Sequence, residues 1–149
     1  MSFKFDNYFF MKTSLRTSII LCVFISITPS CTKEDIIPET YVNFQIRASE
    51  IGGVGQAIYT DLVYGVRGII IYHSDINQYT AYDRACSYQP SDPCEVVQLD
   101  DNESPTYFED ECCGSRFLIN DGTPFSGPAS LGLKQYNTSF DGVYVTVYN

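Results

Sequence analysis

Four cysteines in the second half of this 149-residue chain are the side chains best suited to chemistry. Cys86 and Cys94 lie in one segment, and the adjacent residues Cys112 and Cys113 lie in another. An even set of four cysteines in an exported chain is typical of disulfides, and three pairings are possible. Thiolates also bind metals and exchange electrons. The pattern therefore predicts two loops that close on whatever the cysteines hold.

The chain contains a single histidine, His73, and this count excludes several kinds of catalytic site. No Ser/His/Asp or Cys/His catalytic set can be assembled, and no Gly-rich phosphate loop or carboxylate pair stands out. His73 follows three isoleucines and a tyrosine, without a second histidine or a nearby cysteine in the sequence. We therefore expect a hydrogen-bonded structural histidine and no enzymatic activity.

The elements that must position the cysteines are predicted to be β-strands. Several segments alternate apolar and polar residues, one segment is a continuous β-branched run, and no window shows a sustained helical period. The glycine-rich residues 51–55 are expected to form a loop. The fold class predicted is all-β, with strands at residues 41–46, 67–72, 78–83 and 142–148.

Turn signals surround both cysteine segments. Residues 81–88 end an apolar strand at Cys86, and Cys94 follows after a proline-containing loop. Residues 110–117 form a cysteine-bearing turn and a short strand, which an Asn-Asp-Gly turn at 120–122 and a Gly-Pro loop at 127–128 follow.

These segments together resemble a Rieske iron–sulfur domain. The resemblance rests on the sequences GIIIY, AYDRACSY, CCGSRF and DGTPFSGPA, and it covers residues 65–149. It implies an antiparallel β-sandwich with two cysteine-bearing loops. In that family two cysteines and two histidines hold a [2Fe–2S] cluster, within the patterns C-x-H and C-x-C-H-G-S.

The resemblance keeps only one of the four ligand positions. Cys86 matches the first cysteine, but Tyr88 stands at the first histidine. Asp110 stands at the second cysteine, and Cys113 stands at the second histidine. Ser115 matches a residue that donates a hydrogen bond to the cluster in the family, but a further donor, commonly tyrosine, is replaced by phenylalanine. A histidine-ligated cluster cannot form in one chain with a single histidine, so we expect no cofactor.

The resemblance also selects a pairing for the cysteines. Cys94 and Cys112 match a disulfide that joins the two loops in many family members. Cys86 and Cys113 would then face each other on the side where the cluster would lie. The hypothesis is that a second disulfide, Cys86–Cys113, replaces the cluster, and it would contribute about 3–4 kcal/mol in the chain-entropy model.

Two alternatives use the same side chains. A non-standard [2Fe–2S] cluster or another metal could be held by Cys86, Cys113 and Asp110, with or without Tyr88. Thiol–disulfide exchange at Cys112 and Cys113 is the second alternative, although the neighbouring carboxylates oppose the lowered thiol pKa that such chemistry uses.

Residues 1–30 are predicted to be a signal peptide. Lys12 and Arg16 precede a nine-residue apolar run, which is too short to span a bilayer. Ser30 and Cys31 resemble a bacterial lipoprotein cleavage site, so we expect Cys31 to be lipidated and to attach the chain to a membrane. Ordinary secretion is the alternative, and Met11 could be the true start instead of Met1.

Residues 31–40 are predicted to be a flexible tether, followed by one domain at 41–149. The charged residues 32–35 resemble an export signal of surface lipoproteins in the Bacteroidetes group, although a solvated tether would also have this composition. The expected location is the cell envelope, at the outer membrane or the cell surface.

The charge of the chain argues against nucleic acid as a partner. Residues 1–30 contain three of the nine basic side chains but only one of the eighteen acidic ones, so six basic and seventeen acidic side chains remain. Eight carboxylates and no Lys or Arg lie in residues 92–111, which we expect to be a solvated loop. The predicted function is a binding or structural role, and electron transfer through an altered metal site is the alternative.

Overall fold

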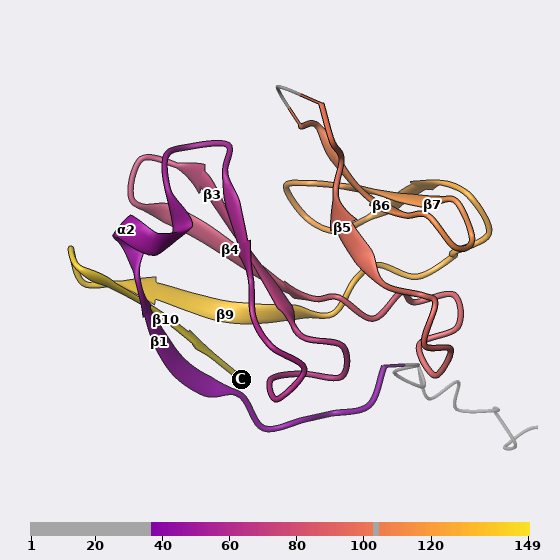
Figure 1. The fold of residues 1–149 in the computed structure, drawn as a ribbon, viewed down its shortest axis with the longest axis horizontal. Coiled ribbons are helices and arrows are strands. Elements are labelled where there is room, and N and C mark those ends of the chain that lie inside the picture. Colours follow the sequence, from indigo (N-terminus) through magenta and orange to yellow (C-terminus); the bar gives the residue numbers. More distant parts are fainter. Residues whose placement is uncertain (1–36, 103–104) are drawn as a thin grey trace, which may run out of the picture. The chain divides into compact units, whose positions relative to one another are not determined.

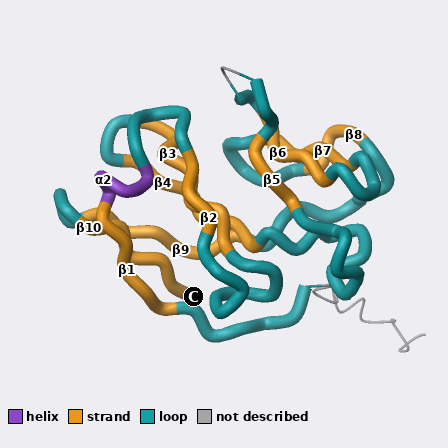
Figure 2. Tube along the Cα trace, viewed as in Figure 1, coloured by secondary structure: helices purple, strands orange, loops and turns teal. Residues whose placement is uncertain are grey.

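The structure is a computed structural model that describes residues 37–102 and 105–149. Within these residues the chain forms two antiparallel sheets and one short helix, α2 (Ala48–Ile51). Figure 1 shows the order of the elements along the chain, and Figure 2 distinguishes the strands from the long loops that join them. The predicted all-β class is confirmed.

The larger sheet has six strands in the order β1-β10-β9-β4-β3-β2, and every neighbouring pair is antiparallel. The first and last strands of the domain pair with each other, which closes the chain on itself. The strands are β1 (Asn43–Arg47), β2 (Ala57–Tyr59), β3 (Ile69–Asp75), β4 (Gln78–Asp83), β9 (Gln135–Phe140) and β10 (Tyr144–Tyr148).

Strand β3 is buried on both faces, as its isoleucine run predicts. Ile69 and Ile71 lie in one core with residues of β10, whereas Ile70 lies in a second core with Phe108 and Phe117. Successive side chains of a strand point to opposite faces, so one apolar run supplies both cores. All three isoleucines are fully buried. This strand therefore links the large sheet to the part of the molecule that carries the cysteines.

The smaller sheet has four strands in the order β5-β6-β7-β8. Phe108 of β6 and Phe117 of β7 lie opposite each other, and both are fully buried. Phe108 also contacts the ring of Tyr82 on β4, with the ring centroids 5.4 Å apart. The aromatic core therefore packs this sheet against β3 and β4. Its strands are β5 (Val97–Leu99), β6 (Tyr107–Asp110), β7 (Ser115–Leu118) and β8 (Pro124–Ser126).

The predicted strands match β1, β3, β4 and β10, and the bounds of β4 agree at both ends. The sequence analysis did not identify β2, β5, β6, β8 and β9. Strands β2 and β8 have only three residues each, and β9 is largely polar with one buried side chain, Tyr136. Helix α2 ends at Ile51, which is buried at the start of the predicted loop.

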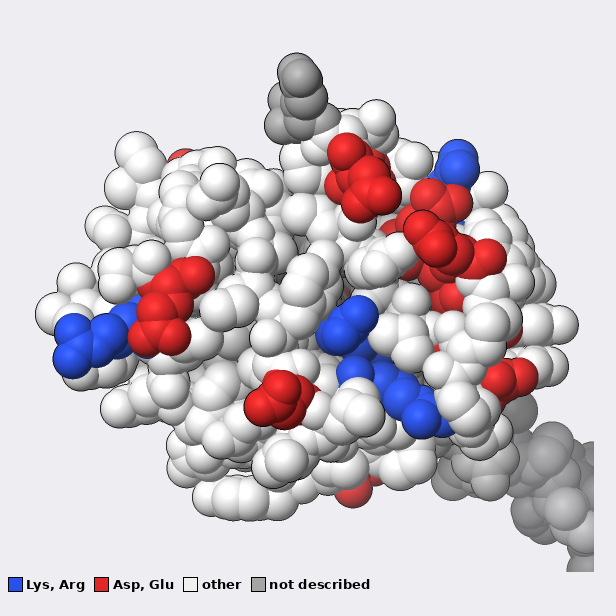
Figure 3. Space-filling view, viewed as in Figure 1, with Lys and Arg blue, Asp and Glu red and all other residues white. Residues whose placement is uncertain are grey.

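The acidic segment 92–111 is not a solvated loop throughout, and this expectation was wrong. It contains β5 and β6, and it buries Glu95, Asp100 and Asp110. Backbone N–H groups make part of this burial possible, because Asp100 accepts hydrogen bonds from Asn102 and Thr106. Asp92, Asp101, Glu109 and Glu111 are exposed or partly exposed, and acidic side chains gather on the side of the molecule where β5 and β6 lie (Figure 3).

The predicted signal peptide and Cys31 lie outside the described residues. Of the predicted tether, residues 37–40 are described, and they contact the domain. Ile37 is buried, and the Lys134 ammonium group donates to the Pro38 carbonyl at 3.1 Å and pairs with Glu39 at 2.9 Å. In the described part of the chain, no helix is long and apolar enough to cross a membrane.

Candidate functional site

The first cysteine loop leaves β4 through Asp83, which is fully buried. Its carboxylate accepts hydrogen bonds from three backbone N–H groups and from the Tyr136 hydroxyl, at 2.7–3.2 Å. The three backbone donors are the N–H groups of Val66, Arg67 and Ala85. Asp83 therefore holds the chain in place three residues before Cys86.

The loop then returns so that Glu95 lies beside Cys86. The Cys86 N–H donates to the Glu95 carbonyl at 3.3 Å, and Ala85 and Val96 form an antiparallel bridge. A backbone pairing of this kind fixes the separation of the two side chains that it carries. Cys86 is fully buried, and Glu95 is 4% exposed.

The second cysteine loop is the turn that joins β6 to β7. Asp110 and Ser115 are paired across the two strands, and the Gly114 N–H donates to the Asp110 carbonyl at 2.8 Å. Gly114 has a φ of 73°, a conformation that glycine adopts without strain. The Cys112 N–H donates to Asp110 Oδ1 at 2.8 Å. The turn therefore holds the Asp110 side chain and places Cys113 just before β7.

A disulfide between Cys94 and Cys112 joins the two loops. Their Cα atoms are 5.8 Å apart, within the ordinary range for a disulfide. Both residues are exposed, so the bond lies on the outside of the loop pair. This is the pairing that the resemblance implied. Cys112 is therefore not a free thiol beside Cys113 in this structure.

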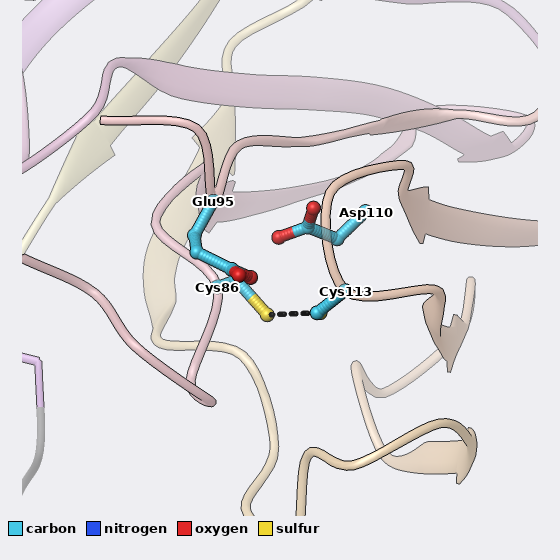
Figure 4. A group of neighbouring side chains, drawn as sticks. All are labelled: Cys86, Glu95, Asp110 and Cys113. Atoms are coloured by element: carbon cyan, nitrogen blue, oxygen red, sulfur yellow. Dashed lines mark hydrogen bonds between the residues drawn. The ribbon is translucent and has the colours of Figure 1, made fainter. Parts of the chain in front are cut away.

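Cys86, Glu95, Asp110 and Cys113 converge beneath this disulfide, and we refer to them as the four-residue group. One sulfur or carboxylate oxygen from each of these residues lies within 4.8 Å of those from the other three. Figure 4 shows Cys86 and Glu95 approaching from the first loop, with Asp110 and Cys113 opposite them.

The second predicted disulfide, Cys86–Cys113, is not formed in the structure. The two sulfurs are 3.7 Å apart, whereas a disulfide bond is about 2.05 Å long, and both thiols are free. The resemblance placed the two cysteines face to face, and the structure does bring them together. The structure also places two buried carboxylates, Glu95 and Asp110, beside the two sulfurs.

Those carboxylates are unusual because part of each is buried without a partner. Glu95 Oε2 and Asp110 Oδ2 accept no hydrogen bond from the described residues. The ion pairs found there, Arg116–Glu109 and Lys134–Glu39, involve other acids. Leaving a buried carboxylate oxygen unpaired costs about 1–3 kcal/mol or more. The group therefore holds buried acceptors with no protein cation against them.

Burial raises the pKa of three side chains, Cys86, Glu95 and Cys113, and so favours their neutral forms. Desolvation raises the pKa of the Cys86 thiol far above its ordinary value, and nearby Asp110 raises it further. Desolvation also raises the pKa of Cys113, which the hydrogen bond to Ser115 partly opposes. The pKa of Glu95 is raised by desolvation and by Asp110. A bound cation would reverse these preferences, because it stabilises thiolates and carboxylates.

The structure unites three of the four sequence positions that match Rieske ligands. Cys86, Asp110 and Cys113 belong to the group, whereas Tyr88 is 43% exposed. Glu95 was missed, because the sequence analysis assigned all the acids of its segment to solvent. Its position directly after Cys94 was the available signal, since a disulfide at Cys94 brings its neighbours to the second loop.

His73 lies in β3 and has a structural role there, as predicted. Its Nδ1 donates to the Gly52 carbonyl at 2.8 Å, and its ring stacks on Tyr79 with the centroids 4.4 Å apart. Ser115 is buried, accepts a hydrogen bond from the Ala129 N–H at 3.1 Å, and lies 3.0 Å from the Cys113 sulfur.

Comparisons by sequence find no family for this chain, whereas comparison with solved structures identifies its fold. No family model matches the chain, and no curated protein matches it. Among solved structures, it is similar to the ferredoxin of carbazole 1,9a-dioxygenase from Nocardioides aromaticivorans IC177. The identity is 18% and the TM-score is 0.51, over 74% of this chain and 98% of that one.

Two further solved structures are similar to this chain to about the same degree. A ferredoxin from Sphingomonas yanoikuyae B1 is 16% identical with a TM-score of 0.50, over 75% of this chain and 99% of that one. A putative NADH-dependent nitrite reductase small subunit from Mycobacterium tuberculosis is 12% identical with a TM-score of 0.50, over 74% and 97%. The described domain therefore has a Rieske-like fold.

The residues present do not fit the cluster that this fold implies. A Rieske cluster has two histidines on one of its irons, and the chain's only histidine lies in β3. Cys86 and Cys113 occupy positions that would bind different irons, but their sulfurs are only 3.7 Å apart. That separation is typical of two ligands on one ion, since a cluster core would hold the two sides farther apart.

Proposed function

We propose that this chain is a lipid-anchored cell-envelope protein whose Rieske-like domain has lost the histidine-ligated [2Fe–2S] cluster. Its role is binding or structural, without catalysis and without electron transfer. The observation that carries this proposal is the set of side chains at the ligand positions, which are Cys86, Tyr88, Asp110 and Cys113. Loss of both histidines removes the ligands of one iron, so no cluster of that type can assemble.

The loop arrangement supports a role that does not need the cluster. The Cys94–Cys112 disulfide joins the loops covalently, and Asp83 holds the first loop to the sheet. Aromatic side chains are exposed near these loops, including Tyr88 and Phe125 at 43% and 52% exposure. Exposed aromatic side chains are typical contact residues of binding proteins. The acidic side chains on the same part of the molecule disfavour polyanionic partners.

Iron and acid-labile sulfide assays on protein purified without oxygen, together with a visible spectrum, test the loss of the cluster. We expect a colourless protein without stoichiometric iron or sulfide. Two irons and two sulfides per chain, with a reducible visible band, would refute the proposal and establish the electron-transfer alternative. The convergence of four donor residues is the observation that keeps this alternative in the test.

The lipid anchor is supported by the predicted signal peptide and by the order Ser30-Cys31 in the sequence. Its test is metabolic labelling with a fatty-acid analogue in a bacterial host, comparing the native chain with Cys31→Ser. We expect label and membrane association only in the native chain. Equal labelling of the variant, or a soluble native chain, would refute the anchor.

A further inference from the structure

We propose that the four-residue group binds one divalent metal ion with the coordination preferences of Zn²⁺. The ligands are the thiolates of Cys86 and Cys113 and the carboxylates of Glu95 and Asp110. This inference rests on the proposed loss of the cluster, because both would occupy the space between the same two loops. The inference extends the proposed function by naming a single metal ion as the group that occupies the former cluster position.

The separation of the sulfurs matches a single ion. Zinc binds thiolates at about 2.3 Å, and a tetrahedral angle between two such bonds places the sulfurs about 3.8 Å apart. The observed distance between Cys86 Sγ and Cys113 Sγ is 3.7 Å. The carboxylate oxygens also lie within 4.8 Å of both sulfurs, so all four donors can reach a common centre after small side-chain movements.

The free carboxylate oxygens give an independent argument for a cation. Asp110 is fully buried and Glu95 is 4% exposed, yet Asp110 Oδ2 and Glu95 Oε2 have no partner among the described residues. Buried carboxylates are normally paired or bound to metal. No Lys or Arg lies in residues 92–111, which contain both acids. A metal ion would satisfy both oxygens at once.

The donor types narrow the identity of the ion. Calcium and magnesium take oxygen ligands, so two cysteine ligands disfavour them. Zinc accepts both sulfur and carboxylate ligands in tetrahedral sites. Two thiolates and two carboxylates carry four negative charges, which is the same charge that a Cys₄ zinc site supplies. The site is therefore no more highly charged than a common structural zinc site.

Neighbouring groups orient the ligands as second-shell partners do in metal sites. The Cys112 N–H binds Asp110 Oδ1, which leaves Oδ2 free for the ion. The Ala129 N–H donates to Ser115 Oγ, so the Ser115 hydroxyl proton can donate to a Cys113 thiolate 3.0 Å away. The Cys94–Cys112 disulfide holds the two halves of the site together.

The test uses the full chain, purified in detergent without oxygen and without added reductant, so that the Cys94–Cys112 disulfide is kept. After treatment with a chelator, Zn²⁺ is titrated in competition with a chromophoric chelator, and Co²⁺ is titrated as a spectroscopic probe. We expect one equivalent of either ion to bind. Bound Co²⁺ should show thiolate-to-metal charge transfer and the visible absorption of tetrahedral cobalt.

Two variants locate the site. Glu95→Gln keeps the shape of the side chain but removes its charge, and we expect Zn²⁺ affinity to fall at least tenfold, since even second-shell changes cost about 10–100-fold. Cys113→Ser should abolish about half of the thiolate charge-transfer absorption. The matched control is Glu111→Gln, an exposed acid next to Asp110, and it should bind like the native chain.

The outcomes separate this inference from the proposed function. A native chain that binds no Zn²⁺ stoichiometrically, or a Glu95→Gln variant with unchanged affinity, overturns the single-ion site and leaves the loss of the cluster standing. A Cys86–Cys113 disulfide found by mass spectrometry in this preparation also overturns the site. Iron with stoichiometric sulfide overturns the proposed function itself. Equal loss of affinity in Glu111→Gln would place the ion on the acidic surface and refute the assignment of ligands.

Discussion

The two ends of this domain are held together in different ways. In the six-stranded sheet, apolar side chains from several strands pack into a common core, with Ile71, Val145 and Val147 fully buried. At the loop end of the four-stranded sheet, the buried residues include sulfur and carboxylate groups, and a disulfide crosses between the loops. The first region depends on many similar contacts, whereas the second depends on a few specific bonds. The two regions should therefore respond differently to substitution.

The largest effect is expected in the sheet. Ile71→Ala removes a fully buried side chain from β3 and leaves a cavity, and we expect the free energy of unfolding to fall by about 3–4 kcal/mol. Ile76→Ala is the control, because Ile76 is 75% exposed and should change stability by less than about 0.5 kcal/mol. Urea denaturation of both variants measures the difference. Equal effects would mean that β3 is not the centre of the core.

The disulfide should have the next largest effect, and that effect should concentrate in the loops. Replacing Cys94 and Cys112 together by alanine opens a loop with a sequence separation of 18, which corresponds to about 3 kcal/mol in the chain-entropy model. Amide hydrogen exchange should increase in residues 84–96 and 111–114 more than in β3 and β4. Uniform loss of protection across both sheets would contradict the separation of the two regions.

A smaller effect tests the close packing behind the second loop. Gly127 has a φ of 87°, and a Cβ there would overlap Ser115 Cα and lie 2.7 Å from the Gly114 carbonyl oxygen. Gly127→Ala must therefore shift the backbone, and we expect a loss of about 2–3 kcal/mol. Gly114→Ala is the matched control, since its φ is 73° but its Cβ would meet open space, and it should cost about 1 kcal/mol. Equal losses in thermal or urea unfolding would show that backbone strain alone decides the outcome.

The smallest effect concerns pH and the turn between β9 and β10. The N–H groups of Tyr144 and Val143 donate to the Asp141 carboxylate and lower its pKa. A lowered native pKa stabilises the fold above the ordinary carboxyl range, and this contribution is lost as pH falls through the lowered value. Asp141→Asn should therefore weaken the loss of stability on the acid side. Unfolding curves at several acidic pH values, with Asp101→Asn as an exposed control, measure this difference.

The local sequence pattern was sufficient to predict those strands in which each face has a clear apolar or polar character. The run at Ile69–Ile71 predicted a strand buried on both faces, and the alternation around Val145 and Val147 predicted one face in the core. Strand β9 was not predicted because most of its residues are polar, and it is held by pairing with β4 and β10. Strands β2 and β8 have three residues each, which is too short to show an alternating pattern.

The candidate site shows the same division. The residue types at Cys86, Asp110 and Cys113 were visible in the sequence, and their match to family positions indicated which loops would meet. Glu95 could not be distinguished from the other acids of its segment by composition. Its burial follows from the backbone pairing with Cys86, a contact that depends on the path of the whole loop.

By itself, the sequence determined the class of fold, the pairing of Cys94 with Cys112 through a family likeness, and the lack of a second histidine. The fold class and the histidine count depend on residue identity and short-range spacing, which a linear chain carries directly, whereas the disulfide pairing was implied by the resemblance. Only the tertiary structure decided that two carboxylates share a buried space with two free thiols. Whether an acid is solvated or enclosed depends on which distant strands close over it, and that is a property of the packed molecule.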